Sequence, residues 1–125
     1  MAEAGLEFSA EPCCWNWEPS QGYKLTRRLL KSQRPRALLC LNDRMAFGAY
    51  QALAEADMDV PDAVAVVSFD NDELASYMRP GLTTIGLPHE AMGGRAVEML
   101  LARQGEGDSV MPMPPVIRSF LRTAS

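Results

Sequence analysis

The chain contains few of the residues on which enzyme chemistry most often depends. It has one histidine, two lysines and three cysteines in 125 residues. It also lacks the GxSxG, phosphate-loop and GxGxxG motifs, which argues against nucleophile-elbow and nucleotide chemistry. A single histidine leaves little room for a general acid–base pair, although Asp70 and Glu73 could in principle supply one. We therefore predict a protein that is not an enzyme, with no catalytic residues and no cofactor.

Cysteines and long apolar runs are equally scarce. Cys13 and Cys14 are adjacent and Cys40 lies in an apolar run, so they form no disulfide framework, and with His89 they match no zinc spacing. No run approaches the ~20 apolar residues that span a bilayer, and the opening MAEAGLEFSAE does not have the regions of a secretory signal. We predict a cytoplasmic protein without a metal site and without membrane contact.

Basic residues are few but unevenly placed. The formal net charge is −4, yet six of the twelve lysines and arginines fall between Lys24 and Arg36. Four of them (Lys24, Arg27, Arg28 and Lys31) share one face of a predicted helix. This face is either a phosphate-binding stripe or a solvated outer surface. We favour the second interpretation because no aromatic or glycine-rich element accompanies the charges.

Apolar runs alternate with helical patterns along one domain. Uninterrupted runs such as AVAVVSF (Ala63–Phe69) are typical of strands covered on both faces, so we predict a parallel sheet in a three-layer αβα arrangement. A weak strand is expected at Phe8–Trp15. The main elements are expected as helix, strand, helix, strand, short helix, strand, helix and strand at residues 19–33, 37–41, 43–56, 63–69, 73–78, 82–87, 89–103 and 114–121. We expect Asp43 to cap the helix that follows it.

Two strands end abruptly in polar residues, at Asn42 and at Asp70. In open parallel sheets, ligands bind beyond the carboxyl ends of the strands, where these two side chains would meet. An amide and a carboxylate suit a hydroxyl-bearing ligand, but both residue types also cap helices. Trp17 could stack on the apolar face of a sugar or simply pack against the protein.

The segment from Pro35 to Gly86 resembles the C-terminal half of the lac repressor (LacI/GalR) family of bacterial transcription regulators. The WEPSQGY segment around Trp17 and the closing RTAS are similar to family segments as well. The family pattern is met at Pro35, Ala37, Asn42, Asp43, Ala46, Gly48, Val60, Pro61, Val64–Val67, Phe69, Asp70, Pro80 and Leu82–Thr84. One departure is Ser68, which stands where the family usually has glycine.

The resemblance implies one lobe of a periplasmic-binding-protein-like (type I) fold. Residues 1–125 would be the C-terminal effector-binding and dimerisation lobe. The crossover at about 82–104 would lead toward an N-terminal lobe that is missing from this chain, as is the helix-turn-helix.

The implied partners are a sugar or nucleoside effector, a second copy of the chain, and operator DNA bound only through the missing N-terminal domain. The residues that match effector contacts are Trp17, Asn42, Asp70 and His89. The residues expected in the dimer interface are Phe47, Tyr50, Tyr77 and Met78. The alternative functions are a periplasmic-type sugar receptor of a transport system and, with less support, a small α/β enzyme.

Overall fold

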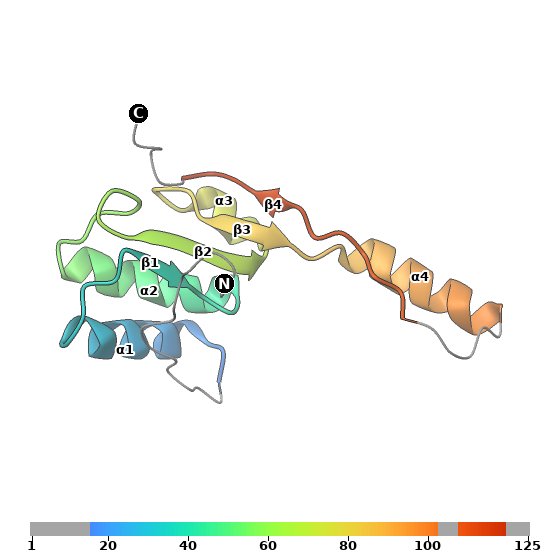
Figure 1. The fold of residues 1–125 in the computed structure, drawn as a ribbon, viewed down its shortest axis with the longest axis horizontal. Coiled ribbons are helices and arrows are strands. Elements are labelled where there is room, and N and C mark those ends of the chain that lie inside the picture. Colours follow the sequence, from blue (N-terminus) through green and yellow to red (C-terminus); the bar gives the residue numbers. More distant parts are fainter. Residues whose placement is uncertain (1–15, 103–107, 120–125) are drawn as a thin grey trace, which may run out of the picture.

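The computed structural model describes residues 16–102 and 108–119 (Figure 1). The strand expected at Phe8–Trp15, the two adjacent cysteines and the terminal RTAS lie outside these residues. The chain forms α1 (Pro19–Leu30), β1 (Ala37–Leu39), α2 (Asp43–Glu55), β2 (Ala65–Asp70), α3 (Glu73–Tyr77), β3 (Thr83–Gly86), α4 (His89–Leu101) and β4 (Pro115–Val116). The predicted order and type of these elements are confirmed, with ends that differ by a few residues.

The four strands form one sheet in the order β1-β2-β3-β4. The first three run parallel, with Leu38 opposite Val66 and Ser68 opposite Thr84. The fourth strand runs antiparallel, with Val116 opposite Thr84, and this differs from the all-parallel prediction. After β3 the chain leaves the sheet along α4 and returns beside it, so it re-enters in the opposite direction (Figure 1). Pro115 has no N–H for the ladder, in keeping with a strand of only two residues.

Helices α1 and α2 pack with their backbones in direct contact. A Cβ atom added to Gly22 would lie 2.0 Å from the Met45 carbonyl oxygen, and one added to Gly48 would lie 1.8 Å from that of Pro19. No side chain fits between the helices at these two points. Helical spacing predicts that Tyr23, Thr26, Leu29 and Leu30 form the inner face of α1. Thr26 is buried and the other three are half-buried. The spacing does not predict the burial of Gly22, whose contribution is the space that it leaves free.

The apolar core lies where α2 and α3 cover one face of β2 and β3. It is formed by Ala46, Leu53, Val64, Val66, Ala75 and Leu82. The spacing of apolar residues in α2 predicts a buried stripe of Met45, Ala49, Ala52, Leu53 and Ala56, and this prediction is correct for the first four. It is wrong for Ala56, which is exposed because α2 ends at Glu55 and Asp57 turns the chain with a left-handed φ of 53°.

Helix α4 extends away from the sheet as an arm, and the segment 108–114 runs back along it (Figure 1). Not one of its thirteen residues is buried. Helical spacing predicts that Met92, Ala96, Met99, Leu100 and Arg103 share one side of α4. The first three line a groove against the returning segment, whereas Leu100 is 78% exposed and does not line it. Arg103 lies outside the described residues. None of the described helices is both long and apolar enough to cross a bilayer.

Candidate functional site

The carboxyl end of β2 forms a sharp turn that presents an acidic side chain at the edge of the sheet. Asp70 has a φ of 111° and Asn71 a φ of 59°, so two consecutive residues other than glycine adopt left-handed backbone. Such conformations cost free energy and persist where the surrounding structure holds them. The Asp70 side chain is half-buried, whereas Asn71 and Asp72 are exposed.

The charges around Asp70 show which side chains share this edge. Burial raises the pKa of the Asp70 carboxyl above its ordinary value, and the negative charges of Asp43 and Asp72 raise it further. His89 lowers the same pKa through its charge, so the first residue of α4 lies within electrostatic range of the tip of β2. No hydrogen bond or ion pair joins the Asp70 and His89 side chains in the described part of the chain.

Asn42 has the capping role that was expected of Asp43. Asn42 is the residue that caps α2, because its Oδ1 accepts the Met45 N–H at 2.8 Å. Its Nδ2 donates to the Trp17 carbonyl oxygen at 3.2 Å, and only 8% of the residue is exposed. The prediction that Asp43 caps the helix is therefore wrong. Asn42 lies at the predicted edge, but both polar atoms of its side chain already have partners within the chain.

Trp17 precedes α1, and its backbone is held by the hydrogen bond that the Asn42 side chain donates to the Trp17 carbonyl oxygen. The residue is 53% exposed, so its indole is not part of the core. An exposed tryptophan whose backbone is fixed is available to contact a ligand or another chain. This exposure favours a ligand-contacting role for Trp17 over simple packing against the protein.

Asp43 is the main residue that sequence reasoning missed. It is the first residue of α2 and is completely buried. Its Oδ1 accepts hydrogen bonds from the Ser68 hydroxyl and, at 2.7 Å, from the Thr84 hydroxyl. Its Oδ2 accepts the Asp72 N–H at 2.6 Å. One carboxylate therefore joins the ends of β2 and β3 and the turn after β2. The only signal in the sequence was Ser68 in place of the family's glycine.

Arg118, which follows β4, holds the same turn from the other side. Its Nη2 donates to the Asn71 Oδ1 at 2.8 Å, and its Nη1 donates to the Leu82 carbonyl oxygen at 2.9 Å. The Asn71 N–H in turn donates to the Thr84 Oγ1 at 3.2 Å. Both the backbone and the side chain of Asn71 are thus fixed by residues far away in the sequence.

The chemistry available at this edge is recognition. Asp70 presents a carboxylate with His89 in electrostatic range, and Trp17 presents an exposed indole. Burial, and then the Asp43 charge, raises the pKa of the Cys40 thiol to about 12, so this thiol stays protonated and unreactive at neutral pH. Within residues 16–102 and 108–119, no three histidine, cysteine or acidic side chains gather as metal ligands would.

The residues expected in a dimer interface do not form one exposed patch. Phe47, Tyr50 and Met78 are half-buried and pack against the core. Tyr77 is 65% exposed, and the neighbouring Leu74, which sequence reasoning missed, is also exposed. The Tyr50 hydroxyl is buried and has no hydrogen-bond partner among the described residues, and burial raises its pKa to about 12. Only the α3 part of the expected surface is open to a partner.

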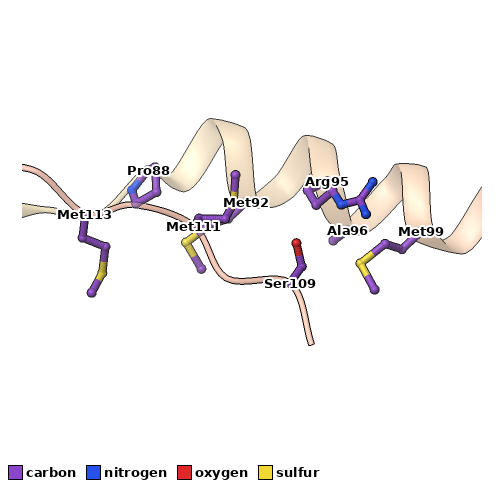
Figure 2. Close-up of a pocket in the computed structure, with 8 residues that line it drawn as sticks. All are labelled: Pro88, Met92, Arg95, Ala96, Met99, Ser109, Met111 and Met113. Atoms are coloured by element: carbon purple, nitrogen blue, oxygen red, sulfur yellow. The ribbon is translucent and has the colours of Figure 1, made fainter. Parts of the chain in front are cut away.

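Two further surface features lie outside this edge. The four basic residues Lys24, Arg27, Arg28 and Lys31, on α1 and at its C-terminal end, are all exposed, which both interpretations of this face require. The groove along α4 has a volume of about 270 Å³. Figure 2 shows its lining side chains between the helix and the returning segment. Four of the eight are methionines, and Arg95 and Ser109 are the polar exceptions. This apolar groove does not resemble the polar edge at β2.

Comparison with known proteins gives this geometry a family. The family model described as a periplasmic binding protein-like domain matches residues 1–119. The chain belongs to this family. It is 43% identical over 105 residues to the ribose operon repressor of Escherichia coli strain K12, a match that covers 82% of this chain and 32% of the relative. It is 37% identical over 114 residues to the HTH-type transcriptional repressor PurR of Aliivibrio fischeri, covering 86% of this chain and 33% of the relative.

Among solved structures, the chain is similar to the lac repressor dimer bound to operator and the anti-inducer ONPF. The TM-score is 0.79 at 31% identity, covering 84% of this chain and 38% of that one. The resemblance to the lac repressor family is thus confirmed in fold and in sequence. The chain spans about a third of the length of the curated relatives that it matches.

Proposed function

We propose that this chain is the effector-binding and dimerisation part of a LacI-type transcriptional regulator that acts in the cytoplasm. The observation that carries the proposal is the half-buried Asp70 carboxylate, held on left-handed backbone at the carboxyl end of a parallel strand with His89 beside it. Its relatives are repressors, which favours a regulator over a transport receptor or an enzyme. Operator DNA would be bound by a separate domain of the regulator and not by this net acidic chain.

The ligand class follows from the side chains at the edge. An ionised carboxylate accepts hydrogen bonds from two neighbouring hydroxyl groups, a pattern that sugars and the ribose of nucleosides offer. His89 can hydrogen-bond a further hydroxyl, and the exposed indole of Trp17 can cover an apolar sugar face. Asn42 contributes first by holding Trp17, and one N–H of its amide remains for a ligand. D-ribose is the first probe to test, because one relative is named a ribose operon repressor.

Dimerisation is assigned to the surface around α3, where Tyr77 and Leu74 are exposed. Phe47 and Met78 lie behind this surface and support it by packing against the core. A homodimer with two-fold symmetry would bury these two side chains against the same side chains of the second copy.

The experiment compares two carboxylates at opposite ends of β2. Titration of the chain with D-ribose, other pentoses, hexoses and nucleosides, followed by NMR, should shift the signals of Trp17 and His89 for at least one compound. Asp70→Asn should weaken that binding by roughly ten-fold or more, because buried ligand hydroxyls lose a charged acceptor. The control, Asp62→Asn, changes an exposed residue before β2 and should leave the affinity unchanged. Equal affinity in both variants would place the effector elsewhere.

A further inference from the structure

We infer that Asp43 is a positioning residue for the effector site: its buried carboxylate sets the conformation of the turn that presents Asp70, without touching the effector itself. The inference rests on the proposed function, because it takes Asp70 as the residue that meets the ligand. It adds a residue that lies beneath the site and that neither the motifs nor the similar proteins assign to it.

The hydrogen bonds converge on Asp43 from both sides of Asp70. Ser68, two residues before Asp70, donates its hydroxyl to Oδ1. Asp72, two residues after it, donates its N–H to Oδ2 at 2.6 Å. Asn71 reaches the same carboxylate in two steps, since its N–H donates to the Thr84 Oγ1 at 3.2 Å and the Thr84 hydroxyl donates to Oδ1 at 2.7 Å. Three of the four nearest neighbours of Asp70 are therefore tied to one side chain.

The turn needs such support. Asp70 and Asn71 adopt positive φ angles that side-chain-bearing residues rarely adopt. A turn of this kind relaxes unless the backbone N–H groups on either side are held. The Asp43 carboxylate holds the Asp72 N–H directly and the Asn71 N–H through the Thr84 hydroxyl. It does so from a fixed place, because Asp43 is the first residue of α2 and this helix begins with the Asn42 cap. The position of Asp70 is thus fixed relative to the start of α2.

The burial of Asp43 means that its carboxylate depends on the hydrogen bonds that this turn and its neighbours donate. None of the residue is exposed, and an ionised carboxylate in that position needs partners for its oxygens. The Ser68 and Thr84 hydroxyls and the Asp72 N–H supply three donors, and the positive end of the α2 dipole faces the same group. Each of these donors comes from the edge that presents Asp70.

The test uses two neighbouring threonines of β3 that differ in one respect. Thr83 and Thr84 are both buried, and each hydroxyl makes one hydrogen bond as a donor and one as an acceptor. Only Thr84 is joined to Asp43, whereas Thr83 bonds the backbone of Ser119 and Arg118. Thr84→Val and Thr83→Val therefore each remove one buried, doubly hydrogen-bonded hydroxyl from β3.

The first readout needs no ligand. In the full 125-residue chain, Thr84→Val should raise the hydrogen-exchange rate of the Asn71 amide by roughly five-fold, the effect of one lost hydrogen bond. This increase should exceed any change that the lower global stability of the variant causes. Asp43→Asn should do the same for the Asp72 amide, because the new side-chain NH₂ cannot accept its hydrogen bond. Carbon-detected titration should show the pKa of Asp70 falling toward its ordinary value in Thr84→Val, as the loosened carboxyl gains water. Thr83→Val should change neither, and Thr84→Ser, which keeps the hydroxyl, should restore both.

The second readout is binding of D-ribose followed by the Trp17 and His89 signals. Thr84→Val and Asp43→Asn should weaken it several-fold, and Thr83→Val should not. Equal effects of the two valine variants on the Asn71 amide and the Asp70 titration would overturn the inference and leave Asp43 a general stability residue. If the amides and the titration respond as expected but the unaltered chain responds to none of the sugars and nucleosides tested, the positioning role stands and the effector assignment fails.

Discussion

Helices α2 and α4 have the same length of thirteen residues but opposite surroundings. Helix α2 begins with a side-chain cap, buries seven residues and touches the backbone of α1. Helix α4 follows Pro88, which makes no side-chain cap hydrogen bond, and none of the residues of α4 is buried. The comparison shows that α2 is stabilised by tertiary contact, whereas among the described residues α4 depends on its own hydrogen bonds and on one shallow groove.

The glycines of the two helices should give the largest contrast. In α2, Gly48→Ala would place a methyl group against the Pro19 carbonyl oxygen, and backbone cannot move aside cheaply. We expect a loss of roughly 3 kcal/mol or more in the free energy of unfolding. In α4, Gly93 has nothing within 4 Å, and Gly93→Ala should raise helix stability by up to ~1 kcal/mol. Urea denaturation of both variants checks the pair, and a tolerated Gly48→Ala would contradict the close contact.

Two exposed apolar side chains, one on α3 and one on α4, should show which surface joins two copies of the chain. Tyr77→Lys alters α3, and Leu101→Lys alters the end of α4, where the side chain is 80% exposed. If α3 forms the interface, only Tyr77→Lys should weaken the dimer, by about 1.5–3 kcal/mol for a large apolar side chain. Sedimentation over a range of concentrations measures both. A larger effect from Leu101→Lys would move the interface to the arm.

The cap of α2 should give an intermediate effect. Asn42→Ala removes the acceptor of the Met45 N–H and the donor to Trp17, so we expect a loss of about 1 kcal/mol in the free energy of unfolding. Asn42→Asp keeps the acceptor and loses only the bond to Trp17, which makes it the matched control. Thermal unfolding and Trp17 fluorescence separate the two contributions. Equal losses in both variants would show that the cap contributes little.

The dependence of stability on pH should give the smallest effect, since Asp70 remains partly solvated. A carboxyl whose pKa is raised in the folded state is unfavourably charged at neutral pH, so folding gains stability as the pH falls. The gain begins near the folded pKa and ends below the ordinary value of about 3.9. Asp70→Asn lacks this titration. The difference in free energy of unfolding between the variant and the unaltered chain should therefore narrow over that pH range, and a constant difference would contradict the raised pKa.

Local patterns were sufficient to predict the elements of this fold. Uninterrupted apolar runs gave the strands, and helical spacing gave α2 and the groove-facing side of α4. They could not distinguish Asn42 from Asp43, because either side chain can cap a helix. The choice is made by Ser68 and Thr84, which lie 25 and 41 residues further along the chain. The close contact at Gly48 was hidden for a similar reason, since it depends on the position of α1 and not on the residue itself.

The arm formed by α4 leaves the sheet and returns to it at one place. His89 begins the helix beside Asp70, and Arg118, after the return, holds Asn71. The helix between them is about 20 Å long at 1.5 Å per residue. The two ends of the arm therefore meet the sheet at adjacent residues of a single turn. A displacement of the arm would change the surroundings of Asp70 and Asn71 together.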